Sequence, residues 1–318
     1  MKENQTPEKK GAACFKTRVG GQALMEGIMM RGPEAMCMAV RQPDGVIFTE
    51  TKPLKKHAWS KIPFLRGILS FVDSMVNGYH CLMKSAEISM EEEEAAAEES
   101  KFDKWINEKF GEKGTNFIMA LASLMGVVLA LVLFLVVPTA FAGLVDHFIP
   151  LGMFRAFVEG VAKLAILIGY MALVARVPEI HRLFRYHGAE HKTIACYEAG
   201  KELTVENIRP CSRYHPRCGT SFLLLVLLLS IIVGACITTE NIALRVLFKL
   251  LLLPVVMGVG YETIQLCGRY DTPLTAAISA PGLWLQRITT QEPDDSMIEC
   301  AIAAVTPVLP KNREDAKW

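Results

Sequence analysis

The chain has 318 residues, of which 51% are hydrophobic and 21% are charged, and its formal net charge at pH 7 is +1. This hydrophobic fraction is high for a soluble protein, so membrane-spanning segments joined to soluble parts are expected. A nearly neutral chain without a basic stripe interleaved with aromatic residues is not expected to bind nucleic acid. Its nine cysteines are an odd number spread along the chain, which argues against a secreted disulfide framework and favours reduced thiols on a cytosolic face.

The first 116 residues are predicted to form a cytosolic part. Residues 1–18 lack the apolar core of a secretory signal and are expected to be a flexible tail. At residues 35–52, AMCMAVRQPDGVIFTETK, two β-prone runs flank Pro43-Asp44-Gly45, which predicts a β-hairpin. Apolar residues then recur at spacings of three and four over 62–88, which predicts an amphipathic helix on the membrane surface or on the spans. The acidic run SMEEEEAAAEES that follows is interpreted as a solvated helix end or linker, with a binding tail as the alternative.

Four later stretches are long and apolar enough to cross a bilayer, which takes about 20 residues. Short connections join the first to the second and the third to the fourth, so two helical hairpins are expected. The charged residues near their outer ends are expected to be accommodated either by snorkelling to the interface or by helices tilted along the interface. The predicted spans are 117–145, 153–176, 219–239 and 243–266, and these charged residues are Arg155, Lys163, Arg245 and Lys249.

The distribution of basic residues predicts the orientation. The loop at 177–218 contains seven Lys and Arg residues, whereas the short loops within the two hairpins contain none. Because positive loops stay inside, this central loop and both termini are expected to be cytoplasmic in a multi-pass plasma-membrane protein. The predicted fold class is an α-helical integral membrane protein with about four transmembrane helices and a small α+β cytosolic N-terminal region. Its regions are a tail at 1–18, a cytosolic part at 19–116, hairpins at 117–176 and 219–266, a His/Cys loop at 177–218 and a cytosolic C-terminal segment at 267–318.

The central loop carries a short pattern that is typical of metal enzymes. His187-Gly188-Ala189-Glu190-His191 reads H-x-x-E-H, the inverted form of a zinc-protease motif. On a helix, His187 and His191 share one face with Cβ atoms about 6 Å apart, so that both imidazoles can reach one metal ion. Glu190 is offset by one position and is the candidate general base for water. The alternative is an ordinary helix that happens to hold two histidines and a glutamate.

A second cluster follows on the same loop. Residues 211–219, CSRYHPRCG, place Cys211, His215 and Cys218 close together, and cysteine and histidine are the ligand types of zinc. The alternative is that His215 and Cys218 cap the next helix. Glu262 lies within the fourth apolar stretch, where an ionisable residue suggests function, so it is a candidate third ligand or partner of a histidine. A salt bridge to an arginine is its alternative role.

Two further stretches carry unusual sequence. Residues 19–36, VGGQALMEGIMMRGPEAM, are rich in glycine, which permits close approach of the backbone, but they do not form a phosphate loop. Residues 271–273, Asp-Thr-Pro, are expected to cap a following helix.

Several of these blocks together resemble the bacterial YqhQ-like membrane proteins. The blocks are GGQALMEGIMMRGP, YHGAEHKTIACYE, SRYHPRCGTSF, GRYDTPLTAAISAPGLWLQ and TTQEPDD, and the resemblance runs over residues 19–305. It implies a multi-pass membrane protein with a His-rich cytoplasmic loop. That family is catalogued as a domain of unknown function and as predicted metal-dependent enzymes, so the resemblance supplies no reaction.

The residues favour a metal-dependent enzyme, of hydrolase type, at the cytoplasmic membrane surface. Zinc is the expected ion, held by His187 and His191 with a third ligand from His215, Cys218 or Glu262, while Glu190 activates water. The location in the lipid bilayer suggests a lipid-linked or membrane-protein substrate. The alternative is a non-catalytic chaperone or assembly factor for other membrane proteins, in which the same residues form a structural metal site or a polar plug.

Overall fold

The computed structural model describes residues 15–310 except 55–61, 91–116, 119, 238, 240 and 271, and it also describes residue 312. The acidic run therefore lies largely outside the described residues. The N-terminal part forms a four-stranded antiparallel sheet in the order β1-β2-β3-β4. The strands are β1 (Gly20–Leu24), β2 (Gly27–Arg31), β3 (Ala35–Arg41) and β4 (Ile47–Pro53). The predicted hairpin is confirmed as β3 and β4, with Arg41 opposite Ile47 and Gly45 at a φ of 86° in the turn.

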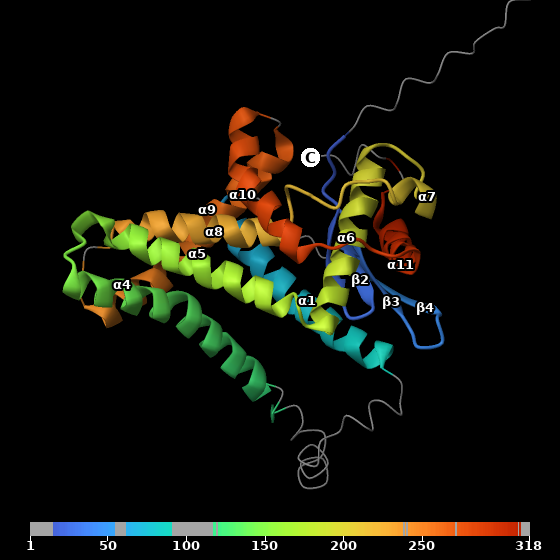
Figure 1. Ribbon diagram of the computed structural model, residues 1–318. Helices are drawn as coiled ribbons and strands as arrows, with labels where there is room; N and C mark the ends of the chain where they lie inside the picture. Colours follow the sequence, from blue (N-terminus) through green and yellow to red (C-terminus); the bar gives the residue numbers. More distant parts are fainter. Residues whose placement is uncertain are drawn as a thin grey trace, which may run out of the picture.

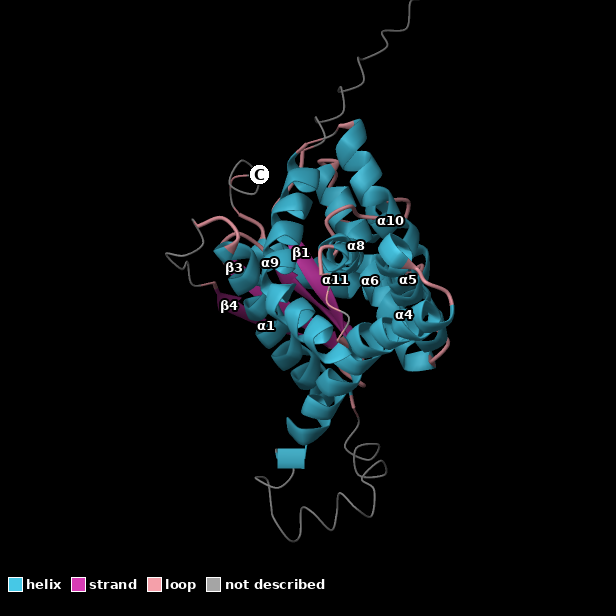
Figure 2. Cartoon of the chain, turned by 90° about the vertical axis from the view of Figure 1, so that its left-hand side faces the viewer, coloured by secondary structure: helices cyan, strands magenta, loops and turns pink. Residues whose placement is uncertain are grey.

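The two central strands of the sheet, β2 and β3, are buried on both faces. Side chains alternate along a strand, so Ile28 and Met30 enter one core while Met29 enters the other. The first core is covered by α6 (Pro178–Glu198) and α11 (Asp295–Val305), and the second by the C-terminal half of α1 (Leu65–Ser89). Figure 1 shows α6 and α11 beside the strands, and Figure 2 shows the sheet enclosed by helices. The central loop and the C-terminal segment thus pack on the N-terminal sheet, an association that local sequence patterns did not predict.

Long apolar helices extend away from this sheet (Figure 1). The first runs continuously over Ala120–Phe148 and includes a π-helical turn, η2 (Val132–Val136), before α4 (Val137–Phe148). The others are η3 (Gly152–Phe154), α5 (Arg155–Val174), α8 (Gly219–Ala235), α9 (Ile242–Arg269) and α10 (Pro273–Thr289). Short turns α7 (Val205–Ile208) and η4 (Thr306–Val308) complete the described elements. The predicted cap is confirmed, because the Thr272 hydroxyl accepts from the Thr275 backbone at the start of α10.

Three of the described helices are long and apolar enough to cross a membrane, which indicates membrane association. They are Ala120–Phe148, α5 and α9. The prediction of four spans is corrected at 219–239, because α8 ends at Ala235 and its 17 residues make it a shorter apolar helix. The predicted amphipathic helix is confirmed as α1, which packs against α9 as well as the sheet.

Three of the four charged residues that were predicted to snorkel are instead buried inside the bundle. Lys163 and Lys249 are buried with Glu159, which supplies a carboxylate to both lysines, and Arg245 is buried with its guanidinium donating to the carbonyl of Ile237. Arg155 pairs with Asp146 at 3.2 Å. The bundle therefore holds a buried network of charges at the end where α5 and α9 begin.

Candidate metal centre

Helix α6 presents the two histidines on one face. Pro178 stands at its first turn, where proline is well suited to begin a helix, and Gly200 follows its end at a φ of 72°. The rings of His187 and His191, four residues apart, have centroids 4.4 Å apart. The helical arrangement predicted for the H-x-x-E-H pattern is confirmed.

Gly188, the second residue of that pattern, allows α6 to approach the chain that follows α10. A Cβ atom at this position would collide with the backbone oxygen of Gln291. The close approach lets Nδ1 of His187 make a hydrogen bond of 2.8 Å to the carbonyl of Thr289. Gly188 therefore has a packing role that supports the orientation of the neighbouring histidine.

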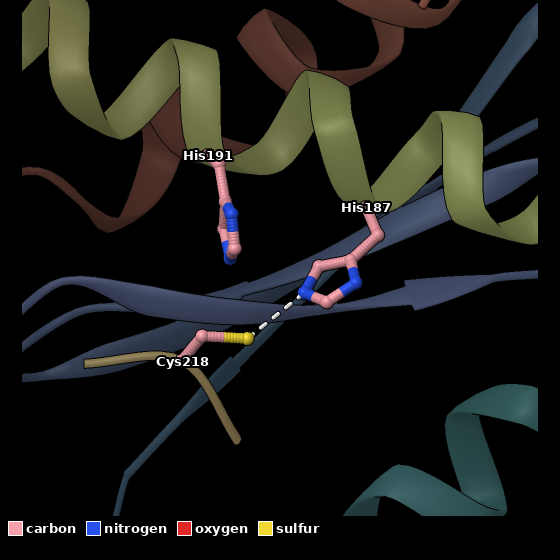
Figure 3. Close-up of side chains that lie close together, drawn as sticks. All are labelled: His187, His191 and Cys218. Atoms are coloured by element: carbon pink, nitrogen blue, oxygen red, sulfur yellow. Dashed lines mark hydrogen bonds between the residues drawn. The ribbon is translucent and has the colours of Figure 1, made fainter. Parts of the chain in front are cut away.

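Cys218 completes a cluster of three potential ligands. It stands immediately before α8, and its Sγ lies 3.1 Å from Nε2 of His187. One ligand atom from each of His187, His191 and Cys218 lies within 4.8 Å of the others. Figure 3 shows the two imidazoles projecting from α6 toward the cysteine, which approaches from the opposite side.

Backbone carbonyls orient both imidazoles. Nδ1 of His187 bonds to Thr289, and Nδ1 of His191 lies 2.6 Å from the carbonyl oxygen of Arg213. When Nδ1 donates to a carbonyl, Nε2 keeps its lone pair and can bind a metal. Ligands of tetrahedral zinc lie roughly 3.3–3.8 Å apart, given bonds of about 2.0–2.3 Å. The three donors fit such an ion after small side-chain adjustments, and no fourth side chain of the described residues joins their cluster.

His187, His191 and Cys218 also shift the pKa values of groups within their own cluster. Burial opposes ionisation of Cys218, but the nearby His187 and His191 lower the pKa of its thiol well below the ordinary value. Burial would likewise lower the pKa of His187, yet the adjacent Cys218 and Glu190 raise it to about 9. The low thiol pKa favours the thiolate of Cys218, which is the form in which cysteine binds metals and attacks electrophiles.

Glu190 lies beside the cluster with one oxygen unused. It is 4% exposed, and burial raises the pKa of its carboxyl group. The Gly21 backbone donates a hydrogen bond to it, whereas Oε2 has no partner among the described residues. Because Gly21 has no side chain, the carboxylate can lie against β1. A buried carboxylate with a free oxygen is suited to accept a proton.

Glu190, His191 and Cys218 line a cavity of about 320 Å³. The cavity lies between the sheet and the helical bundle, since its wall also includes residues of β1, α1 and α9. A ligand in this cavity can therefore contact two of the three potential metal ligands, His191 and Cys218, together with Glu190.

His215, a predicted ligand, lies next to the cluster but outside it. Its ring centroid is 5.6 Å from that of His191, but its Nε2 lies 3.0 Å from Arg217 and 3.8 Å from Glu198. Burial, together with the positive charge of Arg217, lowers the pKa of His215 to about 4. Cys211 is also directed elsewhere, because its Sγ donates to the carbonyl of Asn207 at 3.2 Å.

Glu262, the other predicted ligand, is likewise outside the cluster. Both of its carboxylate oxygens accept from the guanidinium of Arg66 on α1, at 2.8 Å for Nε. The salt bridge considered as its alternative role is therefore present, with a partner that the sequence did not indicate. The arginine is too far along the chain for any local pattern to reveal the pair.

Sequence reasoning also missed Gln286 on α10. Its amide accepts from the backbone of His215 at 2.9 Å and donates to the carbonyl of the same residue at 2.7 Å. It also donates to the hydroxyl of Ser221 at 2.9 Å. The fully buried amide thus fixes the segment that leads into Cys218, and its only signal was a polar residue within an apolar helix.

Comparisons with known proteins identify the family but no reaction. Residues 62–311 match the family model described as "Protein of unknown function (DUF1385)". The chain is 35% identical over 298 residues to the "Uncharacterized protein YqhQ" of Bacillus subtilis (strain 168), which covers 91% of this chain and 92% of the relative. No solved structure matches the chain. The extent of both matches shows that this chain is a YqhQ-like member of the DUF1385 family.

Proposed function

We propose that this protein is a zinc-dependent hydrolase that acts at the cytoplasmic surface of the membrane. One observation carries the proposal: His187, His191 and Cys218 converge beside Glu190, which has a carboxylate oxygen without a partner among the described residues and lines the same cavity as two of them. A structural site is closed by four protein ligands, whereas a catalytic site keeps one position open. Three convergent ligands with an unused carboxylate favour the catalytic kind.

Each residue has a distinct role in this proposal. His187, His191 and Cys218 would hold the ion, and the carbonyls of Thr289 and Arg213 fix the two imidazoles. Bound zinc would supply a Lewis acid that makes water acidic near neutral pH. Glu190 takes a proton from the attacking water and returns it to the leaving group. The hydroxyl thus adds to the electrophilic atom, and the group that departs receives the proton.

The position of the cavity favours a substrate that is held in the membrane. Its wall includes Tyr261, Ile264 and Gln265 of α9, a helix long and apolar enough to cross a bilayer. A lipid-linked molecule or a membrane protein can therefore present a polar bond to the site while its apolar part stays in lipid. The proposed substrate would reach the site from the cytoplasmic side, on the assumption that the sheet lies on that side of the membrane.

One observation favours a second mechanism. Nε2 of His187 lies 3.1 Å from Sγ of Cys218, and Nδ1 of the same ring is held by the Thr289 carbonyl. A nucleophile, a base within hydrogen-bond distance and a third group that orients the base form the arrangement of a cysteine hydrolase. In that mechanism Cys218 attacks the substrate directly, and zinc plays no part in the reaction.

Glu190→Gln tests the zinc mechanism, with Glu179→Gln as the matched control because Glu179 is exposed on the same helix. The glutamine keeps the shape of the side chain but cannot take a proton. We expect zinc content and unfolding temperature to be unchanged, while activity falls by about 10²–10⁴-fold. Complementation of a deletion phenotype is the readout. The control should complement fully.

The same experiment separates the other possibilities when His187→Ala is run beside it. Full rescue by Glu190→Gln together with failure of His187→Ala would contradict the hydrolase and indicate a structural metal, as in an assembly factor. Alkylation of Cys218 by iodoacetamide separates the two catalytic mechanisms. A zinc ligand should be protected by stoichiometric zinc, whereas a cysteine nucleophile should be alkylated at the same rate with or without the ion.

A further inference from the structure

The cavity beside the metal centre has a wall on which arginines outnumber carboxylates. Apart from histidines, the charged side chains among the described residues that line it are Arg18, Arg31, Arg217 and Glu190. Arg217 already donates to the carboxylate of Glu198 and to the carbonyl of Thr17. Arg31 at the end of β2 differs, because most of its guanidinium group remains available to a ligand.

The available part of Arg31 is the edge formed by Nε and Nη2. Its Nη1 lies 2.7 Å from Oδ2 of Asp73, and neither Nε nor Nη2 has a partner among the described residues. In Arg66 and Arg182 the same edge binds a carboxylate, because Nε and Nη2 each donate to one oxygen of a glutamate. This fork of two donors matches two oxygens of a carboxylate or a phosphate. Because Arg31 lines the cavity, its fork is open to an anion there.

Helix α1 holds this guanidinium group in place. Oδ2 of Asp73 pairs with Arg31, while Oδ1 of the same carboxylate accepts from the amide of Asn77 at 2.8 Å. Asp73 is therefore fixed by a neighbour on its own helix, and it restrains Arg31 through Nη1 alone. A side chain that is already restrained loses less conformational entropy when a ligand binds to it.

Neutral polar side chains line the same cavity. In the sheet, Gln22 of β1 is opposite Met29, so it lies diagonally across from Arg31 on the same face, within reach of long side chains. The side chains of Gln22, Ser74 and Gln265 have no hydrogen-bond partner among the described residues, and all three line the cavity. The wall therefore offers more hydrogen-bond donors than the two oxygens of a carboxylate require.

We propose that this wall binds a phosphate group, with two phosphate oxygens on the Arg31 fork and a third on the neutral donors. The fork alone satisfies a carboxylate, whereas a phosphate group has three strong acceptor oxygens. The phosphate belongs to a lipid headgroup or to a soluble phosphate ester. Its link to catalysis rests on the proposed function: the phosphate is the group by which the substrate is recognised, and the bond to be cleaved lies beside Glu190.

Calorimetric titration of the full chain in dodecyl maltoside tests this site. The phosphate probes are dihexanoyl phosphatidic acid and glycerol 3-phosphate. Dihexanoyl glycerol is the same lipid without phosphate, and glycerate is the matched carboxylate. Arg31→Gln should weaken binding of both phosphate probes by about 10–100-fold, because charge-assisted hydrogen bonds are lost.

Arg66→Gln is the matched control and should leave the affinity unchanged. The side chain of Arg66 is 36% exposed, like that of Arg31, and it also pairs with a carboxylate, but it is not on the cavity wall. Arg31→Lys is used as well, since it keeps the charge and the ion pair with Asp73 but has no fork. We expect about tenfold weaker binding in this variant. It decides the test if Arg31→Gln lowers the unfolding temperature.

Several results would overturn the proposal. They are an absence of binding of both phosphate probes to wild type, wild-type affinity in Arg31→Gln or in Arg31→Lys, and binding of glycerate as tight as that of glycerol 3-phosphate. Dihexanoyl glycerol that binds as tightly as the phosphatidic acid would also overturn it. Phosphatidic acid that binds more than about tenfold tighter than glycerol 3-phosphate supports a lipid as the source of the phosphate, and equal affinities support a soluble ester.

The titration is independent of zinc. In the His187→Ala/His191→Ala background, which lacks both imidazoles of the metal centre, Arg31→Gln should weaken phosphate binding by the same factor. Loss of the Arg31 effect in this background would show that the metal holds the phosphate, and would overturn the proposal. A failure of the zinc proposal leaves the factor unchanged, and a failure of phosphate binding leaves the zinc content of the protein unchanged.

Discussion

Replacing Glu159 should destabilise the helical bundle more than replacing either lysine that contacts it. The carboxylate of Glu159 accepts from Lys249 and from Lys163, the latter at 3.1 Å, and from the hydroxyl of Thr139 at 3.1 Å. All four side chains are buried. Glu159→Gln removes the one negative charge that two ammonium groups share, whereas Lys249→Met leaves that charge with Lys163 and Thr139.

The distances set the size of the difference. Two unit charges 3.1 Å apart attract by about 5 kcal/mol at an effective dielectric constant of about 20. Removing one partner of a buried pair costs about 3–5 kcal/mol. Glu159→Gln breaks two such pairs and leaves the lysines to repel each other, so a loss of about 5 kcal/mol or more is expected. Lys249→Met also relieves that repulsion, so we expect a loss of about 3 kcal/mol or less.

Unfolding in detergent, followed by helical circular dichroism, measures the free energy of each variant. A triple variant, Glu159→Gln/Lys163→Met/Lys249→Met, carries no buried charge at this position and should be more stable than Glu159→Gln alone. The reasoning would be refuted if Lys249→Met cost as much as Glu159→Gln. A triple variant less stable than the single glutamine variant would refute it as well.

Two further variants test how the site is built. A Cβ at Gly21 would lie 2.6 Å from the Met29 carbonyl oxygen and 3.1 Å from Cδ of Glu190, whereas a Cβ at Gly20 meets nothing within 4 Å. Gly21→Ala should therefore abolish complementation while zinc is retained, and Gly20→Ala should complement. If both variants complemented, or if neither did, the close contact between Gly21 and Glu190 would not have the role proposed for it. Glu262→Gln should leave zinc content unchanged and cost about 0–1 kcal/mol, because its ion pair is partly exposed. Loss of zinc from this variant would restore Glu262 as a ligand.

Local sequence patterns predicted the elements whose signals lie within a few residues. The turn at Gly45, the amphipathic spacing of α1 and the cap at Thr272 each depend on neighbours in the chain, and all three are confirmed. His187, His191 and Cys218 converge as predicted, because the two ligand clusters lie in one segment, residues 177–218, which turns back after α6.

Partners that are distant in sequence could not be predicted in the same way. Glu262 was recognised as a charge that needed a partner, but Arg66 is 196 residues away. His215 has a ligand type and the right neighbourhood, yet Arg217 and Glu198 take its ring nitrogen. Residues 19–36 were interpreted only as a glycine-rich stretch that permits close backbone approach, and the two short strands that it contains were not predicted because they pack on α6 and α11, which are distant in sequence.

Metal content of the purified protein tests the central claim most directly. Wild type, Cys218→Ser and His187→Ala/His191→Ala are compared by elemental analysis, with His181→Ala as the control on an exposed position of the same helix. We expect about one zinc ion per chain in wild type and in the control, from a site with three protein ligands. Little or none is expected in the double variant, and the content should fall in Cys218→Ser. Zinc retained in full by the double variant, or absent from wild type after zinc is supplied, would contradict the account.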